Sequence, residues 1–224
     1  MNPSPVKKAF RFAALLVALA VVLFSALVYI AVNVPEDKLV REEVKNAHKA
    51  FVEDVTPLPA GLIFIREYTS SNQELSVDYS DPQDAVSKLN TFERQEGYGR
   101  IFAAKDRCTH TGPRYMTVYI DSTNRVEQAG QYYQYVKAEN ALYTQEMTAV
   151  EMGDEAYRVF SSMVNYCSDS EQEAAAMLAF RRGRFLVTLS LSGAETAYQP
   201  EALLEMLLPL AAEIDQRLAQ AGGN

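Results

Sequence analysis

Length, composition and charge narrow the classes of protein to which this chain can belong. Its 224 residues include 21 Lys and Arg against 29 Asp and Glu, a net charge of −8 at pH 7. Because phosphate backbones repel so acidic a chain, we expect no binding to nucleic acid. Only two histidines and two cysteines occur, and their spacing does not match a compact zinc module, so we expect no metal and no cofactor.

Residues 12–34 form the predicted membrane anchor. From Phe12 to Val32 the sequence has no charged residue, and at 1.5 Å per residue this run is roughly 30 Å long, about the thickness of bilayer hydrocarbon. A cleaved signal peptide has a shorter apolar core, about 7–15 residues, before a small-residue cleavage site. A buried core helix would carry a polar stripe. We therefore expect an uncleaved transmembrane helix, with those two readings as alternatives.

The charges beside the anchor predict its orientation. Lys7, Lys8 and Arg11 precede it, and residues 1–11 contain no acidic residue. Positively charged flanks stay in the cytoplasm, so residues 60–224 are expected on the extracytoplasmic, periplasmic side. Without those three cations, 18 basic residues remain against 29 acidic ones, which disfavours contact of this part with anionic lipid.

Cys108 and Cys167 both follow the anchor. An even number of cysteines in an oxidising compartment favours a disulfide, so we expect these two to pair, with two buried free thiols as the alternative. The chain-entropy model assigns such a loop of about 60 residues roughly 4 kcal/mol of stability. No Asn-x-Ser/Thr glycosylation acceptor occurs, which favours a bacterial envelope over a eukaryotic secretory route.

Residues 35–59 are predicted to join the anchor to the main domain. Apolar residues at spacings of four, three and four predict an amphipathic helix over about 36–53; they are Val40, Val44, Ala47 and Phe51. Its apolar side can dock on the following domain or pair with another helix. A proline-containing stretch at 55–61 predicts an extended connector. Residues 60–224 then suit one domain with a single core.

Alternation of apolar and polar residues predicts most of the strands of this domain. The expected strands are 62–68, 74–80, 100–104, 115–121 and 156–164. The clearest hairpin joins 174–180 to 185–192, with Arg182 and Gly183 at its turn, because glycine supplies the positive φ of a tight turn.

Three helices are predicted between and after these strands. The first covers about 81–92, with Asp81 as its N-cap and Pro82 as its first residue. The second covers about 122–139 and the third about 200–218, in which Pro209 is expected to cause a kink or a break. The order of elements predicts an α+β fold: an N-terminal transmembrane helix, then a mostly antiparallel sheet packed with helices on one face.

Three short phrases of the domain resemble a known group. They are Asp84-Ala85-Val86 with Gly97-Tyr98-Gly99-Arg100, Gly153-Asp154-Glu155-Ala156, and Phe180-Arg181-Arg182-Gly183-Arg184-Phe185-Leu186-Val187. Together they are similar to a diffuse set of uncharacterised bacterial envelope domains, whose general shape is the Mog1/PsbP-like α/β/α sandwich. The resemblance covers most of residues 60–220. It implies a binding or accessory module and transfers no functional residue.

The sequence contains no catalytic signature, so we predict that the chain is not an enzyme. It has no Gly-x-Ser-x-Gly elbow, no Gly-rich phosphate loop and no His-Glu-x-x-His. Cys108 lies close to His110, which leaves a thiol nucleophile or a metal ligand pair as weak alternatives. Acidic groups such as Asp154 with Glu155 permit a hydrolase in principle, but solvated surface explains them better.

Two basic clusters stand out against the acidic background. They consist of Arg107, His110 and Arg114, and of Arg181, Arg182 and Arg184. Each lies near a predicted hairpin tip, where guanidinium groups can bind an anionic group through forked hydrogen bonds. The alternative is that these cations pair with neighbouring acids.

Tyrosines crowd the predicted helix 122–139. Tyr132, Tyr133 and Tyr135 cannot all be buried on one narrow stripe, so at least one is expected to be exposed or to line a groove. Tyrosine favours binding surfaces because it combines a large apolar ring with one polar tip. The alternative is packing at the rim of the sheet.

Three functions remain open from the sequence. The leading hypothesis is an extracytoplasmic, non-enzymatic module that binds a protein partner or serves as an accessory subunit of a membrane complex. The second is a domain that binds a small ligand or an envelope polymer in a groove between sheet and helices, lined by tyrosine and arginine near Arg114 or Tyr133. The hydrolase is the weakest of the three.

Overall fold

The computed structural model describes residues 36–144, 147–164 and 172–222. The chain divides into two compact units, residues 1–43 and residues 44–224, and the fold below is that of the second unit. Within the described residues, no helix is both long and apolar enough to span a membrane. The anchor predicted at 12–34 lies outside the described residues and stays a prediction.

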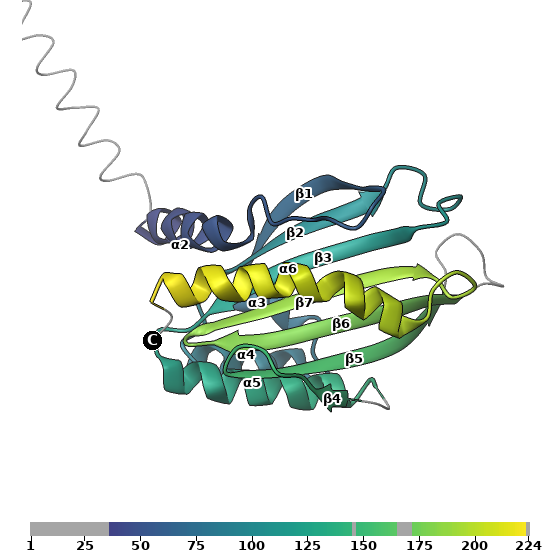
Figure 1. The fold of residues 1–224 in the computed structure, drawn as a ribbon. Helices are drawn as coiled ribbons and strands as arrows, with labels where there is room; N and C mark the ends of the chain where they lie inside the picture. The colour runs from purple at the N-terminus through teal and green to yellow at the C-terminus, as the bar shows by residue number, and fades with distance from the viewer. Residues whose placement is uncertain (1–35, 145–146, 165–171, 223–224) are drawn as a thin grey trace, which may run out of the picture. The chain divides into compact units, whose positions relative to one another are not determined.

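Seven strands form one antiparallel sheet in the described part of the chain (Figure 1). Their order across the sheet is β1-β2-β3-β7-β6-β5-β4, and each strand runs antiparallel to its neighbours. The strands are β1 (Leu62–Ser70), β2 (Gly97–Ala104), β3 (Pro113–Ser122), β4 (Met147–Ala149), β5 (Glu155–Val164), β6 (Gln172–Arg182) and β7 (Phe185–Ala194). The predicted α+β class with an antiparallel sheet is confirmed.

Helices cover both faces of this sheet, so the prediction of one covered face was wrong. The described helices are α2 (Glu36–Val52), α3 (Asn72–Ser76), α4 (Pro82–Thr91), α5 (Val126–Ala141) and α6 (Pro200–Gln220). α6 and the end of α2 pack on one face, whereas α4 and α5 pack on the other (Figure 1). The reason lies in the central strands: Leu186 and Val187 point to opposite faces and are both buried, so each face needs a cover.

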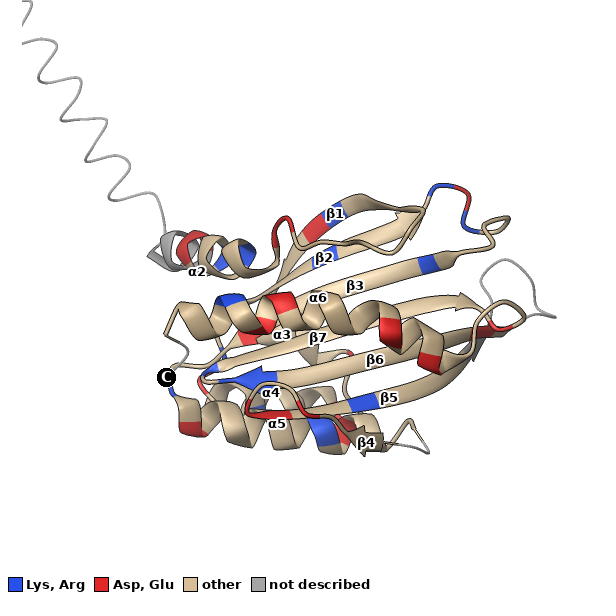
Figure 2. Ribbon diagram, viewed as in Figure 1, with Lys and Arg blue, Asp and Glu red and all other residues tan. Residues whose placement is uncertain are grey.

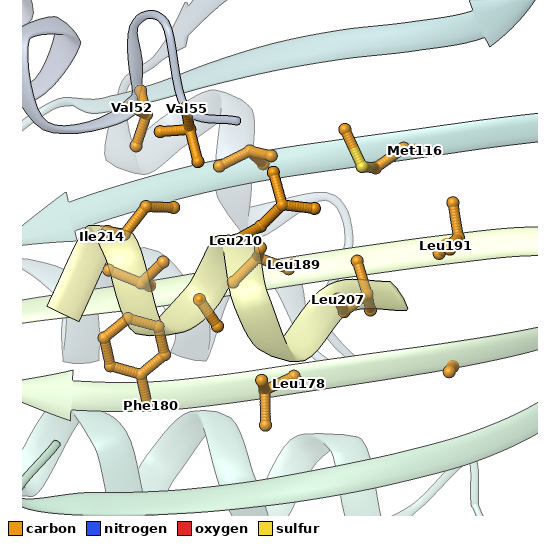
Figure 3. Close-up of a cluster of buried hydrophobic side chains, with 14 of the residues drawn as sticks. Val52, Val55, Met116, Leu178, Phe180, Leu189, Leu191, Leu207, Leu210 and Ile214 are labelled. Atoms are coloured by element: carbon orange, nitrogen blue, oxygen red, sulfur yellow. The ribbon is translucent and has the colours of Figure 1, made fainter. Parts of the chain in front are cut away.

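The larger core lies between α6 and the central strands (Figure 3). Leu207, Leu210 and Ile214 of α6 are fully buried against Leu189 of β7 and Phe180 of β6. These α6 residues follow the helical spacing of three and four, which gives the helix one continuous apolar side. Burial of such side chains is the main favourable contribution to the stability of the domain.

Two elements differ from their predicted structure. Residues 74–80, predicted as a strand, begin in the short helix α3, because Ser71 and Glu74 form a capping box that favours a helix start. α6 continues without a break through Pro209. Pro209 lies on the exposed side of the helix, where water can satisfy the carbonyl that proline leaves unpaired.

Other local predictions are confirmed. Asp81 caps α4 through hydrogen bonds from the backbone N–H groups of Gln83 and Asp84, and Pro82 is the first residue of the helix. The β6–β7 hairpin turns at Gly183, whose φ of 55° lies in the left-handed region that glycine adopts easily.

Residues 44–52 of α2 are attached to the domain by a buried histidine and by apolar packing. His48 is 1% exposed, and its Nε2 lies 2.8 Å from the hydroxyl oxygen of Ser122 at the end of β3. That hydroxyl donates its own proton to Gln95 Oε1 at 2.8 Å, so His48 is the donor to Ser122. Val52 and Val55, which follow, are buried in the larger core. This part of the predicted amphipathic helix therefore packs on the domain.

We predict that His48 makes the stability of the domain fall with acid. Burial, with Arg94 and Arg184 nearby, lowers the pKa of His48 from 6.5 to about 4. The unfolded chain therefore takes up this proton between pH 6.5 and about 4 while the folded chain does not. Below that window the accumulated loss amounts to about 3 kcal/mol. Urea unfolding across this range should show the effect.

The control for this prediction is His48→Gln, which keeps a donor for Ser122 but has no group that titrates. The difference in unfolding free energy between the wild type and this variant should change with pH only below pH 6.5. A difference that stays constant from pH 7 to pH 4 would show that His48 is already accessible to protons in the folded domain.

Candidate functional site

A groove lies between the sheet and the helices of the second face. Its volume is about 570 Å³, and it is lined by β1, β3, β6 and β7, by α3 with the turn that follows it, and by α5. We call it the tyrosine groove, because five of its lining residues are tyrosines: Tyr68, Tyr79, Tyr119, Tyr132 and Tyr143. Cavities of roughly 300–1,000 Å³ are typical of sites for small organic ligands.

The tyrosines hold one another in fixed positions. The rings of Tyr68 and Tyr119 are stacked with centroids 5.9 Å apart, and Tyr79 stacks on Tyr135 at 5.3 Å. Burial is the main cause that raises the pKa of Tyr68 to about 12 and also raises those of Tyr79, Tyr119 and Tyr132. At neutral pH these side chains are therefore uncharged phenols, able to donate and accept hydrogen bonds.

A buried ion pair underlies the groove. Arg94 Nη2 lies 2.5 Å from Asp121 Oδ1, and the two side chains are 0% and 3% exposed. Arg94 follows α4 and Asp121 lies near the end of β3, so the pair joins two elements. The other carboxylate oxygen of Asp121 accepts a hydrogen bond from the Tyr132 hydroxyl at 2.7 Å. This bond fixes a wall of the groove to its base.

Arg94 also organises the neighbouring polar groups. It donates to the Tyr119 hydroxyl at 2.6 Å, to Asn72 Oδ1 at 2.8 Å and to the carbonyl oxygen of Ser70 at 3.3 Å. The Ser70 hydroxyl in turn bonds to the Tyr119 hydroxyl. One guanidinium therefore holds together β1, the start of α3 and β3.

The sheet contributes a polar strip and an apolar strip to the groove. Thr117 of β3 and Ser190 of β7 share a hydrogen bond of 2.6 Å. Thr188 lies two residues before Ser190 and therefore on the same face of β7. Apolar lining comes from Met177 and Leu186, together with Leu75 and Val136 from the helices. A groove of this composition suits a molecule that is partly apolar and partly polar.

Exposed apolar side chains gather where α3 and α5 end. Tyr143, which lines the groove, is 69% exposed, and its neighbour Leu142 is 64% exposed. Val77, next to the lining residue Asp78, is 69% exposed. The backbone N–H of Ser80 donates to Glu139 Oε2 at 3.1 Å, which holds these two ends together. Clustered exposed apolar residues mark binding surfaces.

The three tyrosines of the predicted helix have three different environments. Tyr132 lines the groove. Tyr133 is 2% exposed and packs edge-on against Tyr157 at 5.5 Å between ring centroids. Tyr135 lies over the Tyr79 ring and under the Lys88 ammonium, which is 4.9 Å from its centroid. Neither Tyr133 nor Arg114 is among the lining residues of the groove.

Two arginines of the first basic cluster form ion pairs with one glutamate of the protein. Arg114 is 5% exposed and lies 3.4 Å from Glu173 Oε1, while Arg107 lies 3.7 Å from Oε2 of the same carboxylate. His110 does not join this pairing: its ring fills the space beside Gly61, where an added Cβ would lie 2.5 Å from the ring. Here the alternative of internal ion pairs describes the two arginines better than an anion site.

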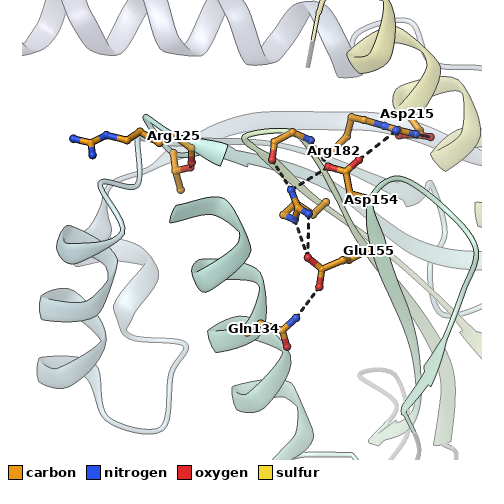
Figure 4. A network of polar contacts seen from close by, with 9 residues as sticks. Arg125, Gln134, Asp154, Glu155, Arg182 and Asp215 are labelled. Carbon is orange, nitrogen blue, oxygen red and sulfur yellow. Dashed lines mark hydrogen bonds and ion pairs between the residues drawn. The ribbon is translucent and has the colours of Figure 1, made fainter. Parts of the chain in front are cut away.

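Two arginines of the second basic cluster, Arg181 and Arg182, are neutralised in the same way (Figure 4). Arg181 lies 3.0 Å from Asp154 and from Glu155, and Arg182 binds both oxygens of Asp215 of α6 at 2.7 and 2.6 Å. Basic and acidic residues accordingly lie together at this end of β6 (Figure 2). Arg184 is exposed and lies over the Phe185 ring at 5.2 Å.

The structure describes only one of the two cysteines of the predicted disulfide. Cys108 is disulfide-bonded, whereas Cys167 lies in 165–171, outside the described residues, so the pairing of the two stays a prediction. Among residues 36–144, 147–164 and 172–222, no group of three His, Cys, Asp or Glu side chains could hold a metal ion.

Sequence reasoning missed most of the tyrosine groove. Arg94, Asp121 and Tyr68 were not singled out, and Tyr79 was assigned to a strand. A usable signal existed in β3, where Tyr119 and Asp121 alternate with the buried Val118 and Ile120. That pattern places both on the opposite face, but it does not reveal that an arginine 25 residues away reaches them.

Comparison with known proteins adds little to this geometry. No family model and no curated protein matches the chain. Among solved structures, the extracellular domain of PknH from Mycobacterium tuberculosis is similar over 76% of this chain and 91% of that one, with a TM-score of 0.37 and 7% sequence identity. A likeness of this size establishes neither a shared fold nor a shared function, and the Mog1/PsbP-like resemblance stays a prediction.

We predict that Asp121→Leu lowers the free energy of unfolding by about 3–5 kcal/mol, because it leaves the Arg94 guanidinium buried without its counter-charge. Adding Arg94→Met should recover part of that loss, so the double variant is expected to be more stable than Asp121→Leu alone. Chemical denaturation of the two single variants and the double variant measures this coupling.

The control is the exposed pair of Asp84 and Lys88, 2.6 Å apart on α4 with side chains 49% and 46% exposed. Asp84→Leu should cost less than about 1 kcal/mol. If the effects of Asp121→Leu and Arg94→Met simply add, the two side chains are not energetically coupled and the assigned role of the pair is wrong.

Proposed function

We propose that this chain is a non-enzymatic binding protein whose tyrosine groove takes a small organic ligand. The observation that carries the proposal is a cavity of about 570 Å³ walled by five tyrosines over a buried ion pair. This proposal keeps the ligand class of the second hypothesis drawn from the sequence but not its place: Arg114 and Tyr133 do not line the groove, whereas Tyr132 does. No arginine is among the described lining residues, and Arg94 lies beneath the lining as a structural support.

The rigidity of the walls supports this proposal. Tyr132 is held by Asp121, Tyr119 by Arg94, and Tyr68 by its stack on Tyr119. Walls fixed before a ligand arrives lower the entropic cost of binding. The described lining residues offer hydroxyls and carboxylates but no His, Cys or Lys, so no hydroxyl there has a histidine or lysine beside it as an activating base.

The predicted setting belongs to the proposal. Residues 12–34 anchor the chain in the cell membrane with the N-terminus in the cytoplasm, and residues 60–224 lie outside. The disulfide-bonded state of Cys108 supports an oxidising compartment. A ligand for the groove would then come from the cell envelope or from outside the cell.

A protein partner remains a second candidate because of the edge strand β1. Ile63, Phe64 and Ile65 are 50%, 46% and 50% exposed on a strand that pairs on one side only. Such an edge can accept an additional strand from another protein. However, β1 carries a bulge between Phe64 and Arg66, a feature that protects edges from pairing. We therefore rank the groove first.

We predict that Thr188→Trp removes the ligand from the protein, because the indole would fill the groove beside Ser190. The full chain is purified from its native membranes in mild detergent, and molecules that it retains are released with solvent and identified by mass spectrometry. Thr148→Trp on β4 is the matched control, since Thr148 does not line the groove. Thermal unfolding checks that both variants are folded.

The expected result is a retained molecule in the wild type and in Thr148→Trp that is absent from Thr188→Trp. Tyr143→Ala, at a wall residue that is 69% exposed, should weaken retention without a loss of stability. The proposal is contradicted if the wild type retains nothing, or if Thr188→Trp retains the same amount.

We predict that the C-terminus lies outside the cytoplasm. Alkaline phosphatase fused after Asn224 should be active, because its disulfides form only in an oxidising compartment. A green fluorescent protein fused at the same residue and exported in the same unfolded way should stay dark. The opposite pattern would contradict the predicted orientation and, with it, an extracytoplasmic source of the ligand.

A further inference from the structure

The charged side chains that line the tyrosine groove have one sign. Its lining includes four carboxylates, those of Glu74, Asp78, Asp121 and Glu139, and no Lys or Arg among the described lining residues. The carboxylate of Asp121 is neutralised by Arg94. The other three carboxylates lie on the helical side of the groove: Glu74 on α3, Asp78 in the turn after it and Glu139 in the last turn of α5.

Two of these three carboxylates keep oxygen atoms available for a ligand. Asp78 is exposed; its backbone N–H donates to the Leu75 carbonyl oxygen, but its carboxylate makes no hydrogen bond or ion pair with any residue that the structure describes. Glu139 is half-buried and uses Oε2 to accept from the Ser80 backbone. Glu74 is different, because its side chain closes the capping box at Ser71. Asp78 and Glu139 are thus the groups on which a charged ligand would depend.

The tyrosine rings favour the same sign of charge. The face of an aromatic ring carries a negative quadrupole, so a cation near Tyr68, Tyr79 or Tyr143 is attracted by the ring as well as by the carboxylates. The field of these carboxylates acts on Tyr68: after burial and Tyr115, the charges of Asp121 and Asp78 raise its pKa, whereas that of Arg66 lowers it. Low-dielectric walls strengthen such a field.

We propose that the tyrosine groove selects an organic cation, a primary or quaternary ammonium attached to an aromatic or aliphatic body. This inference rests on the proposed function, since it names the class of ligand for the same groove. The ammonium group binds near Asp78 and Glu139 and against the tyrosine rings. The body of the ligand packs on the apolar lining of Leu75, Val136, Met177 and Leu186.

Other ligand classes fit these observations less well. A neutral sugar would use the tyrosines and the hydroxyls of Thr117 and Ser190 but would leave the carboxylates without a role. An anion would be repelled by the carboxylates of Asp78 and Glu139, and no Lys or Arg is among the described lining residues to attract it. Charge is therefore the property that separates the three classes experimentally.

The test uses three probes of nearly equal size: phenethylamine, phenethyl alcohol and phenylacetate. Each is titrated into the full chain in a non-ionic detergent, with the heat of titration into detergent alone subtracted. The chain has no tryptophan, so tyrosine fluorescence reports on the groove as a second readout. Phenethylamine should bind, and the neutral and anionic probes should bind at least about tenfold more weakly.

Variants assign this preference to named residues. Asp78→Asn should weaken phenethylamine binding by about fivefold, and the double variant with Glu139→Gln by more, because each change removes one attractive charge at short range. Asp84→Asn is the matched control: it changes the net charge equally, but Asp84 lies on α4, does not line the groove and pairs with Lys88. It should bind as the wild type does.

The outcomes separate the two proposals. If all three probes bind alike, or if Asp78→Asn has no effect, while Thr188→Trp abolishes binding, the groove is a ligand site without selection for a cation. If Thr188→Trp leaves phenethylamine binding intact, the amine binds elsewhere on the acidic surface, and both the cation selectivity and the assigned groove are wrong. If phenethylamine does not bind at millimolar concentration, the inference of a cation site is overturned.

Discussion

The buried pair of Arg94 and Asp121 is the interaction on which the second face of this domain depends. Two desolvated charges are costly, and here the cost is offset by their mutual attraction and by hydrogen bonds from neighbouring polar groups. Asp121 holds Tyr132 of α5, while Arg94 holds Tyr119 of β3 and Ser70 of β1. Three elements, β1, β3 and α5, thus meet at one charged centre.

The groove is a consequence of how the two faces are covered. On the first face, α6 lies along the central strands and its apolar side chains pack into one buried cluster with them (Figure 3). On the second face, cover is divided between α5 and the shorter α3 and α4, and the ion pair holds these helices in place. Between them the sheet presents Thr117, Thr188 and Ser190, small polar residues that do not fill the gap. A cavity therefore remains over the sheet between α3 and α5.

Fold and groove were predictable to different degrees. Helices such as 82–91 and the β6–β7 hairpin follow from Asp81, Pro82 and Gly183, because caps and tight turns depend on residues a few positions apart. The strand predicted at 74–80 was wrong because a capping box at Ser71 outweighs alternation over so short a segment. The basic clusters were recognisable as arginines, but their acidic partners, such as Glu173 for Arg114, lie 59 residues away.

The sequence by itself determined the local elements, the antiparallel α+β class, the acidic surface and the prediction of a membrane anchor, since each depends on periodicity, composition or neighbouring residues. Only the tertiary structure decided that both faces are covered, that Tyr132 rather than Tyr133 lines a groove, and that Arg94 neutralises Asp121. These outcomes depend on which strands pair and on how helices pack across the sheet. Long-range pairing of this kind leaves no regular spacing in the chain, so it cannot be read before the fold is known.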